Sequence, residues 1–131
     1  MRLSDCAKNY YLDQNKNCAV ALLLGGSDYY KLELNEQDAT LLTGFGGGIG
    51  CGAVCGCLAG SVAVLGKMFS HRADFRKICA GFAQLFSEQM GGSENCRDIM
   101  PRFIIKPGFR CYGAVAKAAD LLQDYIAKIK D

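Results

Sequence analysis

The sequence contains no tryptophan, only two prolines and a single histidine among its 131 residues. So few prolines exclude proline-rich chains, and sixteen glycines without a repeating period exclude collagen-like ones. The lone histidine, His71, follows a predicted helix cap and offers no base for a Ser/His/Asp hydrolytic arrangement. The formal net charge of +2 is too small to indicate a nucleic-acid or membrane-surface partner, and we expect neither.

The sequence also lacks the segments that direct a chain to a membrane or across it. Residues 1–16 are polar and of mixed charge, without the apolar core of a secretory signal. The 28 uncharged residues from 39 to 66 are long enough to span a bilayer, but nine of residues 44–66 are glycine. We therefore expect a cytoplasmic protein without a membrane span, whose thiols stay reduced.

What remains is a globular composition, with 50% hydrophobic and 21% charged residues, divided by glycine and polar turns into short helical segments. We predict an all-α fold, a compact single-domain bundle of about five to six helices over residues 1–131. The second helix should end at Gly25-Gly26, and a glycine-rich segment should form the central helix. The main predicted helices are Cys18–Leu24, 36–43, Cys51–Leu65, His71–Met90, Cys96–Met100 and Cys111–Lys130.

Glycine recurs every four residues in the predicted central helix, at Gly52, Gly56 and Gly60. One face of that helix would then carry no side chains. Each glycine costs a helix about 1 kcal/mol relative to alanine, which indicates that something presses against this face. A neighbouring helix or a bulky cofactor beside Cys51 would both explain it. We predict cofactor contacts at the glycines of this region, namely Gly48, Gly50, Gly52 and Gly56.

Eight cysteines are the outlying feature of the chain, yet local metal and redox motifs are absent. There is no CxxC pair, no CxxCH and no ferredoxin spacing, so a four-cysteine site must be assembled from distant segments. Four cysteines lie in or beside the first turn of a predicted helix: Cys18, Cys51, Cys96 and Cys111. The unpaired N–H groups there favour thiolates, and four converging ends would suit an anionic cluster of cysteine-ligated iron.

At these positions the sequence resembles the C_GCAxxG_C_C family of redox-active proteins. Residues 47–56 are similar to its glycine run and CGAxxG motif, Asn17-Cys18-Ala19 to its upstream cysteine, and Cys96 and Cys111 to its last two cysteines. The resemblance implies an all-helical domain in which Cys18, Cys51, Cys96 and Cys111 are functional. A related domain in split-Soret cytochromes accompanies an iron–sulfur centre, which implies a cluster here as well.

The sequence departs from the family pattern at Cys55 and Cys57, where small or hydroxyl residues are expected. Cys55 could replace or supplement a ligand, so the predicted metal-ligand set comprises Cys18, Cys51, Cys96, Cys111 and Cys55. Cys57 is interpreted as a small buried residue. Tyr11 is assigned to the core or an interface. Arginines lie near the last two cysteines, either as solvated surface or to screen a negative cluster and dock an acidic partner: Arg97, Arg102 and Arg110.

We therefore expect a redox protein that transfers electrons through an iron–sulfur cluster of unspecified type to a partner protein. Three alternatives remain open. Metal-free thiol–disulfide chemistry could use Cys51–Cys96 or Cys51–Cys55, zinc could bind the same thiolates, and the cysteines could merely fill space in an interaction module. The sequence indicates no catalytic residue, does not decide whether the protein is an enzyme, and leaves a homodimer open.

Overall fold

The structure, a computed structural model, describes residues 1–104 and 110–129. Within them the chain forms seven α-helices and no strand, so the predicted all-α class is confirmed, with slightly more helices than expected. The predicted end of the last helix at Lys130 lies outside the described residues. The helices are α1 Leu3–Lys8, α2 Cys18–Tyr30, α3 Glu36–Ala39, α4 Gly56–Phe69, α5 Phe75–Gln89, α6 Cys96–Phe103 and α7 Tyr112–Ala127.

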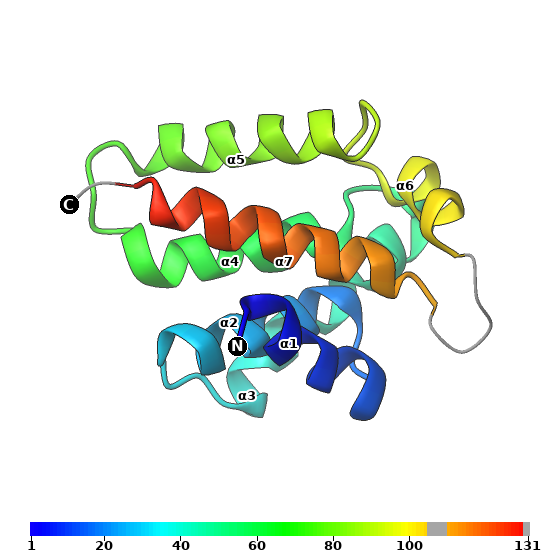
Figure 1. Cartoon of the computed structure of the whole chain (residues 1–131), viewed down its shortest axis with the longest axis horizontal. Coiled ribbons are helices and arrows are strands. Elements are labelled where there is room, and N and C mark those ends of the chain that lie inside the picture. Colours follow the sequence, from blue (N-terminus) through cyan, green and yellow to red (C-terminus); the bar gives the residue numbers. More distant parts are fainter. Residues whose placement is uncertain (105–109, 130–131) are drawn as a thin grey trace.

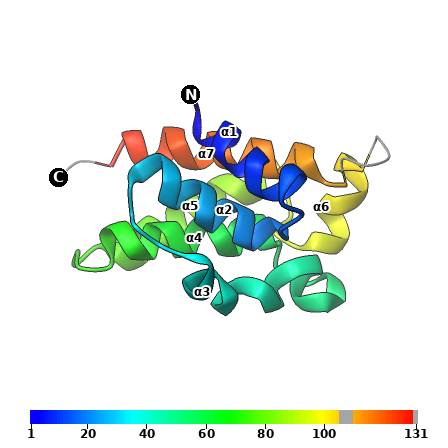
Figure 2. The same cartoon turned by 90° about the horizontal axis from the view of Figure 1, so that it is seen from below.

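The longer helices α4, α5 and α7 run side by side along the long axis of the molecule, as Figure 1 shows. Helices α1, α2 and α3 lie along the other side of α4 and α7, and α6 sits at one end of the bundle. The perpendicular view in Figure 2 places α2 between α7 and α4. No helix of residues 1–104 or 110–129 combines the length and the apolar character that crossing a membrane requires.

Helix α2 is enclosed on all sides, because every residue from Ala19 to Ser27 is buried. Its near-continuous apolar sequence is typical of a helix without a solvent face. The prediction that it ends at Gly25-Gly26 is wrong, since the helix continues to Tyr30. These glycines serve close packing instead: a Cβ on Gly25 would lie 2.8 Å from the backbone of Ala7, and one on Gly26 would lie 2.6 Å from Val64 Cγ2.

The predicted central helix begins later than expected. A π-helical segment, Gly48–Gly52, precedes α4 and contains left-handed backbone at Ile49, Gly50 and Gly52, with φ of 60°, 68° and 76°. A left-handed residue cannot continue a right-handed helix, so α4 starts only at Gly56. The prediction that this helix begins at Cys51 is therefore wrong.

Gly56 and Gly60 do form a bare face on α4, and α2 packs against it. A side chain on Gly56 would collide with Cys18 Sγ, and one on Gly60 would collide with the carbonyl oxygen of Ala19 and lie 2.9 Å from Leu22 Cβ. The glycine spacing could reflect a neighbouring helix or a bulky cofactor, and at Gly56 and Gly60 the structure shows a neighbouring helix. The contact brings the start of α4 against the start of α2.

We predict that Gly60→Ala lowers the free energy of unfolding by about 2 kcal/mol, because the added methyl group overpacks the contact between α4 and α2. Gly66→Ala is the matched control on the same helix, where the nearest atom to a new Cβ is Phe75 Cζ at 3.8 Å. The control should raise stability by up to about 1 kcal/mol through helix propensity. Urea denaturation of both variants measures the difference, and equal effects would contradict this packing.

Candidate functional site

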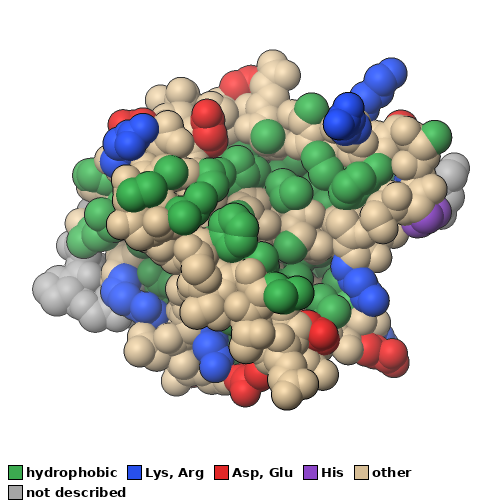
Figure 3. Space-filling model, turned by 180° about the vertical axis from the view of Figure 1, so that it is seen from behind, with side chains coloured by type: hydrophobic (Ala, Val, Ile, Leu, Met, Phe, Trp, Pro, Cys, Tyr) green, Lys and Arg blue, Asp and Glu red, His purple; other side chains and the backbone are tan. Residues whose placement is uncertain are grey.

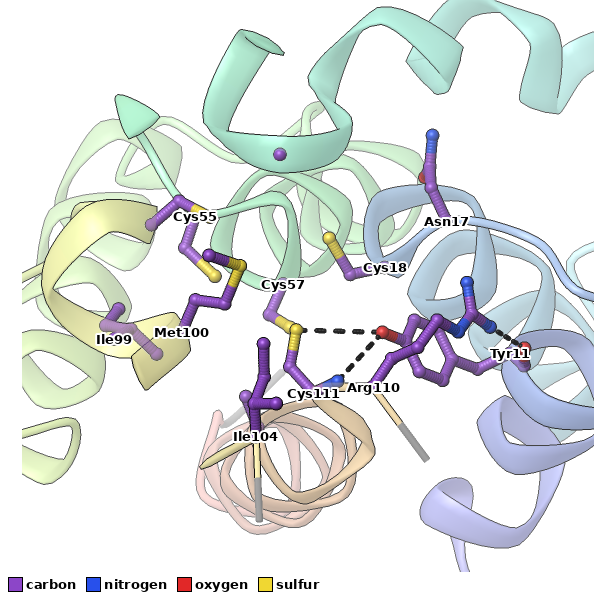
Figure 4. A pocket seen from close by; sticks show the side chains of 13 residues that line it. Tyr11, Asn17, Cys18, Cys55, Cys57, Ile99, Met100, Ile104, Arg110 and Cys111 are labelled. Carbon is purple, nitrogen blue, oxygen red and sulfur yellow. Dashed lines mark hydrogen bonds between the residues drawn. The ribbon is translucent and has the colours of Figure 1, made fainter. Parts of the chain in front are cut away.

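A cavity of about 450 Å³ lies where four helices begin. This volume falls within the roughly 300–1,000 Å³ typical of small-ligand and cofactor pockets. Figure 4 shows side chains from distant parts of the chain directed toward it. Much of the wall is apolar, with contributions from Tyr11, Ile99, Met100, Ile104 and Ala114. Five of the eight cysteines also line it: Cys18, Cys55, Cys57, Cys96 and Cys111.

Four of these cysteines stand at the start of an α-helix. Cys18 is the first residue of α2, after Asn17, whose side chain caps the helix by accepting from the N–H of Val20. Cys96 is the first residue of α6, and Cys55 and Cys111 are the N-cap residues of α4 and α7. Helix starts carry unpaired N–H groups and partial positive charge. Four helix starts therefore direct their partial positive charge toward this cavity.

The structure corrects the position of Cys51. It brings Cys18, Cys96 and Cys111 to the cavity, but Cys51 is exposed and is not among the residues that line it. Its thiol instead donates to the carbonyl oxygen of Gly48 at 3.4 Å, within the left-handed segment before α4. Because the helix begins at Gly56, the cysteine at its start is Cys55.

The glycines predicted to contact a cofactor are not among the described residues that line the cavity. The described lining residues include Gly47, but not Gly48, Gly50, Gly52 or Gly56. A Cβ on Gly48 would lie 2.6 Å from Cys96 Cβ, and one on Gly52 would lie 3.0 Å from Arg97 Cβ. Gly48 and Gly52 therefore let their segment approach the start of α6, which carries Cys96. A Cβ on Gly50, by contrast, would have no neighbour within 4 Å.

Two backbone hydrogen bonds hold Cys55 beside the start of α6. The N–H of Cys96 donates to the carbonyl oxygen of Ala53 at 2.7 Å, and the N–H of Cys55 donates to that of Glu94 at 2.8 Å. These bonds flank the isolated antiparallel bridge between Val54 and Asn95. They satisfy backbone groups at two helix starts and hold two of the cavity cysteines in register.

Cys57 sets the protonation of two neighbouring thiols. Its side chain is only 1% exposed and interacts with the thiols of Cys18 and Cys55, to either of which it can donate its single hydrogen. The bond from Cys57 lowers the pKa of Cys18 to about 7, assisted by backbone N–H groups and opposed by burial. The same thiol is the main reason that the pKa of Cys55 is lowered. These bonds and burial raise the pKa of Cys57 itself well above its usual value, so Cys57 keeps its proton.

The other two helix-start cysteines experience a different environment. Burial is the main cause that raises the pKa of both Cys96 and Cys111. The hydroxyl of Tyr11 opposes the shift at Cys111, because it donates a hydrogen bond to Cys111 Sγ at 3.6 Å. Sequence reasoning missed this role of Tyr11 and the role of Cys57. Tyr11 and Cys111 are 100 positions apart, so no local pattern could reveal their contact.

The five thiols surround the cavity without forming a ready site for one metal ion. Within residues 1–104 and 110–129, no three side chains of His, Cys, Asp or Glu are close enough together to hold a single ion. A ligand that contacts the thiols from opposite walls must therefore be larger than one ion, or the walls must move inward.

The chain is similar to known proteins over most of its length. The model of a family described as "Putative redox-active protein (C_GCAxxG_C_C)" matches residues 16–125, which include all the cysteines of the cavity but not Tyr11. A protein of Archaeoglobus fulgidus, described as "Uncharacterized protein", is 30% identical over 141 aligned positions, covering 92% of this chain and 89% of that protein. No solved structure gives a significant match.

We predict that alkylation of Cys18 in the metal-free protein is half-maximal near pH 7 and increases with pH, because the thiolate is the reactive form. Cys111 should require a higher pH, since its pKa is raised above the usual value. Cys57→Ala removes the donated hydrogen bond and should shift the Cys18 midpoint upward. Mass spectrometry of iodoacetamide-treated protein resolves the two sites, and an unchanged midpoint in the variant would refute the role of Cys57.

Proposed function

Because the chain belongs to the C_GCAxxG_C_C family, which is described as redox-active, we propose that it transfers electrons through an iron–sulfur cluster. The ligands in this proposal are Cys18, Cys55, Cys96 and Cys111. The observation that carries it is the placement of these four cysteines, each at a helix start, around one cavity. Four cysteine thiolates are the usual ligand set of both common cluster types.

The donor set and the shape of the cavity fit such a cluster better than a single zinc ion. Zinc requires thiolate sulfurs at about 2.3 Å from one centre. No three described donors are grouped closely enough for that, whereas a multi-iron cluster spans a wider space. Soft thiolates also favour iron–sulfur clusters over hard cations. The N–H groups of four helix starts would stabilise the negative charge of the cluster and its ligands.

Residues of this chain would bind the cluster, shield it from water and donate hydrogen bonds to its ligand sulfurs. When bound, the cluster supplies one-electron redox chemistry, and a partner protein exchanges the electron. Ile99 and Met100 contribute apolar side chains of α6 to the wall of the cavity. The Cys57 thiol keeps its proton and can donate it to one of two ligand sulfurs, that of Cys18 or that of Cys55. Hydrogen bonding to ligand sulfurs and exclusion of water are the main means by which a protein sets a cluster potential.

A metal-free dithiol site is the second candidate, and the contact between Cys18 and Cys57 favours it. A readily formed thiolate beside a thiol can be oxidised to a disulfide. The sulfurs of Cys18 and Cys57 would form one bond and lose two electrons and two protons. A disulfide of the partner would take these up as two thiols. The pairs predicted from the sequence, Cys51–Cys96 and Cys51–Cys55, have one member outside the cavity.

The test compares two cysteines that are four positions apart. Wild-type protein, Cys55→Ser and Cys51→Ser are reconstituted without oxygen using ferrous iron and sulfide. We expect brown wild-type protein and a brown Cys51→Ser control, whereas Cys55→Ser should lose most of its bound iron and visible absorption.

Metal analysis together with ultraviolet–visible spectra measures these outcomes. Loss of iron in Cys51→Ser but not in Cys55→Ser would contradict the ligand set. A colourless, iron-free wild type that instead forms a reversible Cys18–Cys57 disulfide, detected by mass spectrometry, would favour the second candidate.

A further inference from the structure

We infer that Tyr11 is a positioning residue for Cys111, and that its hydroxyl group makes the reduction potential of the site more positive. This inference rests on the proposed function, because the potential is that of the proposed cluster. Tyr11 lies outside residues 16–125, the part of the chain that matches the family. It belongs to a π-helical segment, Asn9–Asp13, that follows α1 and reaches the wall of the cavity.

The hydroxyl of Tyr11 makes two hydrogen bonds with one residue. Its oxygen accepts from the backbone N–H of Cys111 at 3.2 Å, and its hydrogen is donated to Cys111 Sγ at 3.6 Å (Figure 4). A phenol has a single hydrogen to donate. Because the backbone N–H approaches the oxygen as a donor, the hydrogen of the hydroxyl is left for the sulfur. The pair of bonds therefore fixes both the direction of the hydroxyl and the position of Sγ.

Three further contacts hold the Tyr11 ring in place. The ring is buried, with the side chain 3% exposed. The guanidinium of Arg110 lies 4.1 Å from the ring centroid and donates to the main-chain carbonyl of Tyr11. The ring also stacks on Tyr112, with centroids 6.4 Å apart. A ring held in this way keeps its hydroxyl at the sulfur without much loss of conformational entropy on binding.

The effect of the Tyr11 hydroxyl on the reduction potential follows from the charge of the cluster. Reduction adds an electron, so the sulfurs of the reduced state carry more negative charge than those of the oxidised state. A hydrogen bond donated to a ligand sulfur stabilises the reduced state more, which raises the potential. The cation of Arg110 above the ring acts in the same direction. A hydrogen bond from Tyr11 to the sulfur of Cys111 would also orient that sulfur toward the cluster.

The experiment measures the midpoint potential of the reconstituted full-length protein in Tyr11→Phe and in a matched control. Tyr10→Phe removes the neighbouring hydroxyl, which donates to Asp28 at 2.8 Å and does not line the cavity. We expect a shift to a more negative potential in Tyr11→Phe, with unchanged iron content and helical circular dichroism, and no shift in Tyr10→Phe. A merely structural role of Tyr11 would leave the potential unchanged.

A second measurement compares the wild type with Tyr11→Phe. Exchange into deuterium oxide should shift the resonance Raman bands of the iron–cysteine bonds more in the wild type than in the variant, because only the wild type has the exchangeable hydroxyl hydrogen at Cys111 Sγ. Equal deuterium shifts, or equal potentials, in Tyr11→Phe and wild type would overturn the role of Tyr11 and leave the cluster in place. A wild type that takes up no iron would overturn the proposed function, and this inference with it.

Discussion

The close approach of α4 to α2 is the contact on which the cavity depends. Gly56 and Gly60 present bare backbone to α2, so the first turn of α4 meets Cys18 and Ala19. A larger residue at either glycine would separate the two helix starts and move Cys55 and Cys57 away from Cys18. The other helix starts are attached to this pair by backbone contacts. The Val54–Asn95 bridge brings in α6 with Cys96, and Tyr11 fixes Cys111 at the start of α7. The cysteine cavity is thus a consequence of how the helices begin and pack.

The hydrogen bonds of the cavity divide its cysteines into two kinds. The thiol of Cys57 lowers the pKa of both Cys18 and Cys55, because it can donate its hydrogen to either, whereas burial raises the pKa of Cys96 and Cys111. The two side-chain donors to cavity sulfurs come from different places in the chain: Cys57 from within α4, and Tyr11 from the N-terminal segment. Figure 3 shows the back of the molecule, where hydrophobic side chains are exposed between charged ones.

Local signals predicted the parts of the fold that local chemistry determines. Asn17 caps α2 and places Cys18 at its start as the sequence indicates, and α5 and α7 follow their apolar periodicity. The start of α4 is predicted too early because the sequence CGA at 51–53 resembles CGC at 55–57, and the left-handed backbone at Ile49, Gly50 and Gly52 is not evident from composition. Cys51 was consequently predicted at the helix start that Cys55 occupies. Tyr11 gave no signal, since its contact with Cys111 depends on how α1 packs on α7.

We propose that sulfurs from four helix starts hold one group in one cavity. A crystal structure of protein purified and reconstituted without oxygen is the decisive test. It should show a cluster bonded to the Sγ atoms of Cys18, Cys55, Cys96 and Cys111, with Cys51 free at the surface. Iron bonded to Cys51, or a cavity filled by apolar side chains with its thiols far apart, would contradict it.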